Sequence, residues 1–354
     1  MVEYHGMNVL GVESSCDETA AAVVANGRQI ISNVVNSQIN IHKLYNGVVP
    51  EVAARSHLEV VIPVIDEAVQ AAGGWDQIDA IANTTMPGLI GSLLIGSLSA
   101  RMLAIVKNKP YYPVHHVEAH VYANFLGDKA PSFPFLSLII SGGHSQIVLF
   151  RDHGNYELIG QTADDAVGEA FDKVAKIISL PYPGGPSIAE AAKNGDPHRF
   201  HFPKAHMHNK YDFSFSGLKT AVLREVQSTV GVDHTFPSTK LAEKLDEQTR
   251  NDFAASFQQI ACETLVDKLV MATNEFQPRS VVVAGGVAAN QELRRQLIER
   301  LPIPINFPTP ALCTDNAAMV ASLGYFKAQR TTPTDPRHLE VIPSISMNQT
   351  IWNN

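Results

Sequence analysis

Two histidines four residues apart, His116 and His120, are the first candidates for chemistry in this sequence. If the segment HHVEAH is helical, the two imidazoles lie about 40° apart on one face, because each residue turns the helix by about 100°. This spacing is typical of a pair of metal ligands, and equally of two partly exposed histidines. Glu118 would lie about 200° from His116 and face away. The metallopeptidase arrangement, in which a glutamate activates metal-bound water, is therefore disfavoured.

A carboxylate near the end of the chain could complete such a site. Asp315 lies in the segment CTDN, directly before a predicted helix at 317–327. Thr314 or Asp315 can cap this helix, and capping is the simpler role for Asp315. As a third ligand, Asp315 would instead complete a two-histidine, one-carboxylate site, which admits Fe or Zn.

Glycine-rich turns form the second group of candidates. The apolar runs 135–140 and 147–150 flank Ser141-Gly142-Gly143-His144, a pattern that predicts a β-hairpin. Backbone N–H groups can approach an anion here, because glycine has no Cβ. A predicted strand at 280–284 likewise passes through Gly285-Gly286 into a helix, which brings backbone amides to a ligand. Neither segment is a Walker loop or a GxGxxG motif, so those nucleotide-binding modes are unsupported.

The order strand, polar turn, strand occurs twice in the chain. Residues 8–12 and 20–24 flank a polar turn that contains Asp17 and Glu18, and the hairpin at 134–150 repeats this layout. Two such hairpins favour an internal duplication with two lobes and a cleft between them. Hairpins are common, so a coincidence is the alternative.

Several predicted helices would hold these segments in place. The segment 164–180 is the clearest amphipathic helix, with Gly168 on its polar face. Glycine there costs about 1 kcal/mol relative to alanine, which makes sense if a ligand or backbone packs against it. The other predictions are a helix at 50–72 with a break at Pro63, an apolar core helix from Pro87 to Ile105, a proline-stiffened loop at 181–186, a long helix at 241–276, and an extended surface tail from Thr331.

Composition limits the possible classes of protein. The length of 354 residues favours two domains. A net charge of −8 argues against a chain that grips nucleic acid unaided. The segment 197–219 is nevertheless locally basic and aromatic, and suits either stacking on unpaired bases or a charged surface loop. Three scattered cysteines suit a reducing cytoplasm, and we expect neither a secretory signal nor a membrane span.

Ten motifs lie in order over roughly residues 7–328: GVESSCDETAAAVV, VPEVAARSHL, MPGLIGSLLIG, HHVEAH, LIISGGHSQIV, DDAVGEAFDKVAKI, PYPGGP, FSFSGLKTAV, VVVAGGVAANQEL and CTDNAAM. Together they resemble the bacterial tRNA adenosine threonylcarbamoyltransferase family, relatives of the archaeal and eukaryotic Kae-type protein. One departure is Met86, where the family usually has glycine before Pro-Gly.

The resemblance implies an α/β, two-lobed fold of the actin/Hsp70/sugar-kinase type, with duplicated mixed β-sheet domains and a central nucleotide cleft. The expected domains are an N-terminal lobe at 7–131, a C-terminal lobe at 132–312 and a tail at 329–354, with the helix 314–328 packed back on the first lobe. The family's metal ligands fall on His116, His120 and Asp315. Its substrate-binding positions fall on Ile139, Ile140, Ser141, Gly142, Gly143, Asp172, Gly185 and Asn290.

The implied reaction moves a threonylcarbamoyl group from threonylcarbamoyl-AMP to the exocyclic N6 amine of the adenosine 3′ of the anticodon, and releases AMP. The substrates are tRNAs that read codons starting with A. A metal, Fe or Zn, would hold the threonylcarbamoyl end and stabilise oxyanion charge. The amides of Ser141 to Gly143 would hold phosphate, and Asp172 and Asn290 would hold ribose or base. Asp17 or Glu18 is the candidate proton acceptor.

The resemblance also implies partners in the cytoplasm. These are tRNA, a smaller paralogous subunit (TsaB-like) and an ATPase subunit (TsaE-like), with the adenylate made by a separate synthase and no role for a membrane. The alternatives are a small-molecule kinase of the same fold, which leaves the histidine pair unexplained, the disfavoured metallopeptidase, and a non-catalytic paralogue.

Overall fold

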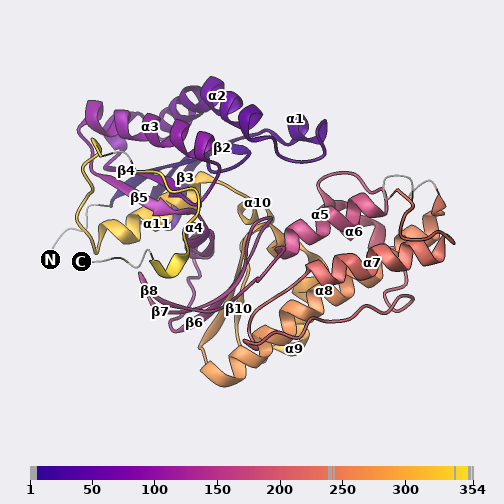
Figure 1. The fold of residues 1–354 in the computed structure, drawn as a ribbon. Helices are drawn as coiled ribbons and strands as arrows, with labels where there is room; N and C mark the ends of the chain where they lie inside the picture. The colour runs from indigo at the N-terminus through magenta and orange to yellow at the C-terminus, as the bar shows by residue number, and fades with distance from the viewer. Residues whose placement is uncertain (1–5, 238–240, 242–243, 339, 350–351, 353–354) are drawn as a thin grey trace. The chain divides into compact units, whose positions relative to one another are not determined.

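The chain folds into two compact units, and the computed structural model describes residues 6–237, 241, 244–338, 340–349 and 352 (Figure 1). The first unit combines residues up to 133, the short segment 150–157 and the C-terminal segment from 306. The second unit contains residues 134–149 and 158–305. The chain therefore leaves the first unit and returns to it at its end.

A five-stranded sheet in the order β3-β2-β1-β4-β5 forms the centre of the first unit. β1 pairs antiparallel with β2 and parallel with β4. β4 continues the sheet parallel to β5. The strands are β1 (Asn8–Glu13), β2 (Glu18–Ala25), β3 (Gln29–Ser37), β4 (Ala80–Met86) and β5 (Tyr111–His115).

Helices cover both faces of this sheet, and the alternation of side chains along β1 explains how. Leu10 and Val12 belong to the core shared with α2 (Pro50–Ala71) and α3 (Ile90–Lys107). Gly11 points the other way, to α11 (Ala317–Ala328), which lies close enough that a Cβ at Gly11 would collide with Ala317 O. Successive residues of a strand face opposite sides, so a strand buried on both faces is apolar throughout.

The second sheet repeats the first in topology. Its order is β10-β9-β6-β7-β8, with β6 parallel to β9. The five strands have equivalent positions in the two sheets: β6 corresponds to β1, β7 to β2, β8 to β3, β9 to β4 and β10 to β5. This equivalence confirms the predicted internal duplication. The strands are β6 (Phe135–Ile140), β7 (Ser145–Asp152), β8 (Asn155–Gln161), β9 (Ser280–Ala284) and β10 (Ile305–Asn306).

Two pairs of helices also have equivalent places in the two halves of the chain. α8 (Glu247–Phe276) precedes β9 as α2 precedes β4, and α9 (Gln291–Arg300) connects β9 to β10 as α3 connects β4 to β5. The other helices are α1 (Ile39–Lys43), α4 (His116–Tyr122), α5 (Val167–Ile177), α6 (Gly184–Ala192), α7 (Ser216–Thr229) and α10 (Pro310–Cys313), with 3-10 turns at Trp75–Gln77, Ala123–Phe125, Gly286–Ala289 and Met347–Gln349.

Three predicted local features differ in the structure. Pro63 does not break α2, because it lies on an exposed side of a continuous helix where a missing N–H is tolerated. The segment predicted as a loop at 181–186 contains the start of α6 at Gly184. α3 is not a core helix throughout, since Leu98, Met102 and Val106 are exposed.

α3 also has the length and hydropathy of a membrane-spanning helix, with a mean hydropathy of 1.5 over Ile90–Lys107. The helix is not an uninterrupted apolar run, because Arg101 and Lys107 lie within it, and the absence of a membrane span stays a prediction. One face of α3 packs in the first unit through Leu93, Ala100 and Ala104. A helix of this kind is common inside proteins that have no membrane segment, so it is weak support for a span.

The C-terminal tail is more than an extended surface segment. Ile342 N–H donates to Thr85 O at 3.0 Å, and Gly88 N–H donates to Pro343 O at 3.1 Å. The Met347 side chain is 1% exposed. These contacts attach the tail to the first unit beside the end of β4.

The close approach of α11 to β1 predicts the effect of adding one methyl group. Gly11→Ala should lower the free energy of unfolding by about 1–3 kcal/mol, because strand and helix must separate to admit the Cβ. Gly217→Ala near the start of α7 is the control, since a Cβ there meets no atom within 4 Å. Denaturant unfolding of both variants measures the difference, and equal stabilities would contradict the tight contact.

Candidate active site

His116, His120 and Asp315 converge at one point of the first unit, as the metal-site prediction requires. Each offers a ligand atom within 4.8 Å of the others. His120 Nε2 lies 3.1 Å from Asp315 Oδ1, and His116 Nε2 lies 3.7 Å from the same oxygen. The two imidazoles come from one face of α4, and the carboxylate comes from the turn before α11. Residues about 200 positions apart thus form a two-histidine, one-carboxylate set.

The unsatisfied atoms of His120 fit a cation in this position. The His120 side chain is 2% exposed, yet neither ring nitrogen has a hydrogen-bond partner among the described residues. Its 3.1 Å approach to Asp315 lacks the geometry of a hydrogen bond. Buried polar nitrogens are rarely left without partners. An imidazole nitrogen beside a carboxylate oxygen and a second imidazole suits a divalent transition metal.

Glu13, which is not among the predicted site residues, contacts the His116 imidazole and orients it. Its Oε2 lies 3.1 Å from His116 Nδ1 and accepts a 2.6 Å hydrogen bond from Thr84 Oγ1. Its Oε1 accepts a 2.6 Å hydrogen bond from Ser15 N–H. A carboxylate on Nδ1 fixes the tautomer that leaves Nε2 available to a metal. In the sequence, Glu13 is marked only as an acidic residue at the end of an apolar strand. This pattern alone does not predict a contact with His116.

The electrostatics of this cluster favour a positive charge between the carboxylates. Burial alone would lower the pKa of His116, but Glu13 and Asp315 raise it to about 9. Burial would raise the pKa of Glu13, whereas the His116 imidazole lowers it. Two carboxylates in a buried pocket therefore stabilise a cation at the imidazole, which is a property expected of a metal site.

Asp315 is released from the capping role that the sequence allowed. Asn316 is the N-cap of α11, and its Oδ1 accepts the Met319 N–H at 3.1 Å. The Asn316 Nδ2 also donates to Thr314 O at 2.8 Å. Because the neighbouring side chain satisfies the helix end, the Asp315 carboxylate can serve the histidine pair instead.

Asp17 and Glu18, the predicted proton acceptors, lie at the end of the turn between β1 and β2 and at the first position of β2, respectively. Burial, and then the charge of Asp315, raises the pKa of Asp17. Burial raises the pKa of Glu18 to about 7, although its hydrogen bond from Ser37 Oγ opposes the shift. Glu18 Oε2 has no hydrogen-bond partner among the described residues. Burial also raises the pKa of the adjacent Cys16 thiol, which disfavours a nucleophilic thiolate.

Most of the predicted substrate positions gather around the β6–β7 turn of the second unit. Ile139 and Ile140 are buried in β6, and a Cβ at Gly285 would collide with Ile140 O. Gly168 of α5 packs against the same turn, because a Cβ there would lie 2.6 Å from Ser141 O. Backbone contact therefore explains the unusual glycine in the polar face of α5.

The turn itself presents free backbone groups. Ser141 N–H donates to His144 O at 2.8 Å and closes the hairpin. Within the described part of the chain, the N–H groups of Gly142 and Gly143 donate to no backbone carbonyl. A Cβ at either glycine would meet no atom within 4 Å. Open space above two available amides is what an anion requires.

The other predicted substrate residues have structural partners of their own. Asp172 Oδ1 accepts the Gly184 N–H at 2.7 Å, which ties α5 to the start of α6 beside Gly185. Asn290 is the N-cap of α9, and its Oδ1 accepts the Leu293 N–H at 3.1 Å. Both residues position their helix ends, so any role in binding comes in addition to this one.

The basic and aromatic segment 197–219 is not a free surface for unpaired bases. Phe213 and Phe215 are fully buried, and Phe200 stacks on Phe253. The cations are paired: Arg199 with Asp252, Lys204 with Glu263 and Asp267, Lys210 with Glu275, and Lys219 with Asp165. The stacking interpretation of this segment is therefore wrong, because the aromatic residues form core and the charges neutralise each other.

The ligand set predicts which substitutions remove a bound metal. The His116→Ala and His120→Ala variants should each lose the metal that the unaltered protein retains, because two ligands rarely hold a transition metal against buffer. His338→Ala is the control, since His338 is exposed and lies outside the cluster. Elemental analysis of purified protein gives the stoichiometry. Full metal content in either variant would contradict the ligand set.

The Glu13 contact predicts a smaller effect. Glu13→Gln keeps the side-chain shape but removes the charge beside His116, so metal affinity should fall by about ten- to a hundredfold. Competition with a chromogenic chelator measures this affinity. An unchanged affinity would show that Glu13 is required only for packing.

Comparison with known proteins identifies the family. Residues 29–322 match the family described as TsaD, tRNA N6-adenosine threonylcarbamoyltransferase. The chain is 49% identical to the protein of that name from Thermomicrobium roseum, over 93% of this chain and 94% of the relative. It is 50% identical to the one from Symbiobacterium thermophilum, over 90% of this chain and 91% of the relative.

Solved structures support the predicted fold at low sequence identity. HypF of T. kodakarensis matches with a TM-score of 0.58 and 13% identity, over 92% of this chain and 48% of that protein. Component A of (R)-2-hydroxyglutaryl-CoA dehydratase from Acidaminococcus fermentans matches with a TM-score of 0.50 and 15% identity, over 92% and 100%. Together with the duplicated sheets, these matches confirm an actin/Hsp70/sugar-kinase-type fold. By its sequence, the chain belongs to the tRNA N6-adenosine threonylcarbamoyltransferase family.

Proposed function

We propose that this protein transfers the threonylcarbamoyl group of threonylcarbamoyl-AMP to the N6 amine of the adenosine 3′ of the anticodon, in tRNAs that read codons starting with A. AMP is the leaving group. The observation that carries the proposal is the convergence of His116, His120 and Asp315 in a chain of this family. A non-catalytic paralogue would have no reason to keep three metal-ligating side chains around one point.

The chemical problem is that the exocyclic amine of adenine is a weak nucleophile, so the acyl donor must be held in place and polarised. A metal on His116, His120 and Asp315, Fe or Zn, would supply a Lewis acid for the carbonyl oxygen of the donor. The amides of Gly142 and Gly143 are available to bind the phosphate of the leaving AMP. Asp172 in α5 and Asn290 at the start of α9, both in the same unit, would bind ribose or base.

Two other functions have weaker support. A small-molecule kinase would share the fold, but it gives no role to the two imidazoles and the carboxylate at one point. In the HExxH metallopeptidase arrangement, a glutamate of the histidine helix lies beside the metal and acts as the general base for its bound water. Glu118 instead accepts hydrogen bonds from Tyr156 and Trp352 on the opposite face of α4, as the helical spacing predicts.

We propose that a partner supplies part of the tRNA-binding surface. The net charge is −8, and the cations of the segment 197–219 are already paired. A smaller paralogous subunit would fit the apolar face where Leu58 and Ile62 of α2 lie near Leu98, Met102 and Val106 of α3, all of them exposed. An ATPase subunit would complete the assembly, a separate synthase would supply the adenylate, and the reaction would take place in the cytoplasm.

The function is tested by supplying preformed threonylcarbamoyl-AMP and unmodified tRNA to the purified protein, with and without the two partner subunits. Nucleoside mass spectrometry should detect threonylcarbamoyladenosine in the tRNA. His120→Ala should abolish it while folding is retained, and His338→Ala should not. If the complete assembly forms no product with the unaltered protein, the proposal is wrong.

The raised pKa of Glu18 predicts how the transfer step depends on pH. A carboxylate accepts a proton only when it is ionised, so single-turnover transfer should rise as pH passes through about 7 and level off above it. Glu18→Gln should be slow and lack this inflection. Asp17→Asn is the matched comparison. An inflection that persists in Glu18→Gln and vanishes in Asp17→Asn would move the role to Asp17.

A further inference from the structure

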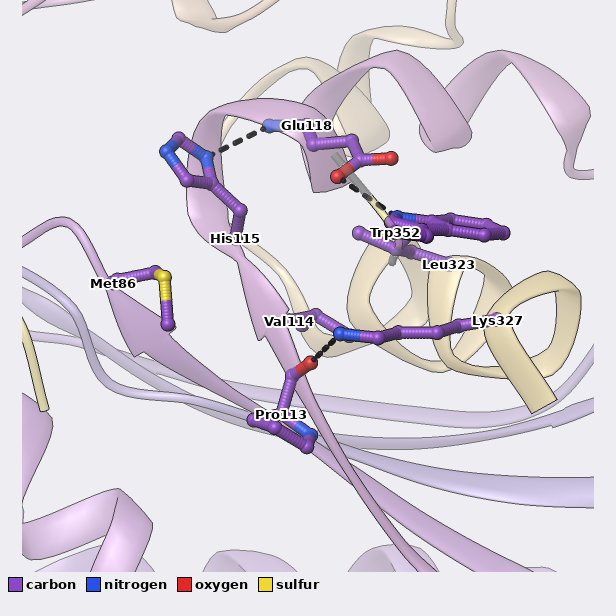
Figure 2. A pocket seen from close by; sticks show the side chains of 8 residues that line it. All are labelled: Met86, Pro113, Val114, His115, Glu118, Leu323, Lys327 and Trp352. Carbon is purple, nitrogen blue, oxygen red and sulfur yellow. Dashed lines mark hydrogen bonds between the residues drawn. The ribbon is translucent and has the colours of Figure 1, made fainter. Parts of the chain in front are cut away.

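A cavity of about 200 Å³ lies in the first unit, beside Glu118 of α4 (Figure 2). A water molecule occupies about 30 Å³ in the liquid, so the cavity has room for a small organic molecule. Its lining combines apolar and charged side chains: Met86, Pro113, Val114, His115, Glu118, Leu323, Lys327 and Trp352. None of these residues has a role in the function proposed above.

The acidic side of this cavity carries a carboxylate oxygen that has no partner. Glu118 is 1% exposed. Its Oε2 lies 3.2 Å from the Tyr156 hydroxyl and accepts the Trp352 Nε1–H at 3.4 Å. Its Oε1 is buried without any hydrogen-bond partner among the described residues. A buried carboxylate oxygen is stable only when a donor reaches it, and Glu118 is one of the residues that line the cavity.

The basic side of the cavity carries an ammonium group with spare donors. Lys327 Nζ donates to Pro113 O at 2.7 Å, which uses one of its three N–H groups (Figure 2). Among the described residues, no ion pair joins Lys327 to Glu118. The two charges still interact, because Lys327 acts to lower the pKa of Glu118 and Glu118 acts to raise the pKa of Lys327, in each case against the larger effect of burial. An acid and a base therefore line one small cavity without contacting each other.

The C-terminal tail contributes one wall of this cavity. Trp352 forms part of its wall and packs tightly against Gly154, where a Cβ would clash with the indole ring. His115 Nε2 lies 3.4 Å from Ile345 O, and the Tyr156 hydroxyl lies 3.3 Å from Met347 O. The tail thus holds an indole ring over a charged pocket, and that ring is a built-in reporter of what enters.

We propose that this cavity binds a small α-amino acid as its zwitterion. The ammonium group would donate to the Glu118 carboxylate, the ligand carboxylate would accept from Lys327 Nζ, and a short aliphatic side chain would pack against Met86, Val114 and Leu323. One ligand with a positive and a negative end satisfies both buried charges at once, whereas a simple anion or cation leaves one of them unpaired. The site is separate from the metal ligands and does not depend on the transfer reaction.

The test uses the fluorescence of Trp352. The chain has two tryptophans, so Trp75→Phe leaves Trp352 as the single reporter. Titration of this full-length variant with glycine, alanine, serine, threonine and valine should give a saturable change in emission for at least one of them. Calorimetric titration of the unaltered protein checks that the substitution has no effect on binding. No saturable binding by any of the five would overturn the proposal and leave a water-filled cavity.

Paired variants assign the binding to this cavity. Glu118→Gln and Lys327→Met should each weaken binding at least about tenfold, because each leaves one end of the ligand without its buried partner. The controls are Glu67→Gln and Lys129→Met, which change the same charges on the exposed surface. Binding that survives both cavity substitutions unchanged would lie elsewhere and would overturn the assignment.

Changes in the ligand keep the test decisive if a cavity variant fails to fold. Ethylamine lacks the carboxylate of alanine, and propionate lacks its ammonium group. Both should bind the unaltered protein at least about tenfold more weakly than alanine does. Equal binding by alanine and either analogue would show that the two buried charges do not act together.

Discussion

The contact between Glu13 and His116 is the interaction on which the metal-ligand cluster depends. It joins the end of β1 to the first residue of α4, and Thr84 at the end of β4 donates to the same carboxylate. The Glu13 carboxylate thus connects the end of β1, the last residues of β4 and the start of α4. Because Glu13 is fully buried, it is stable only with these donors in place. The sheet order places them there, so the fold and the orientation of the imidazole are fixed together.

Close backbone packing has the same importance in the second unit. Gly285 lies against Ile140 O, and Gly168 lies against Ser141 O, so strand ends and helix starts meet around the β6–β7 turn. A side chain at either glycine would push these elements apart. The result is a turn whose Gly142 and Gly143 amides remain open. The N-terminus of α5, which contains Gly168, adds partial positive charge beside this turn and favours a phosphate.

The charge distribution limits what the chain does alone. Cations that the sequence suggested for nucleic acid are paired with acidic side chains: Lys204 with Glu263 of α8, and Lys219 with Asp165, which precedes α5. Exposed ion pairs contribute little stability, but they reduce the positive potential that a phosphate backbone would meet. Apolar residues are instead exposed along α2 and α3. These features support the proposal that a protein partner supplies part of the tRNA-binding surface.

The sequence by itself determined the local features. The spacing of His116 and His120 placed both imidazoles on one face, and the repeated hairpin pattern indicated the duplicated sheets, because helical and strand periods are properties of neighbouring residues. The tertiary structure decided which distant residues meet: that Asp315 reaches the histidines while Asn316 caps α11, that Glu13 lies beneath His116, and that the tail reaches Glu118. The aromatic segment at 197–219 shows the same limit, since composition gives no information about which rings are buried. These outcomes depend on the order of strands in the sheets, which brings together segments that local periodicity cannot relate.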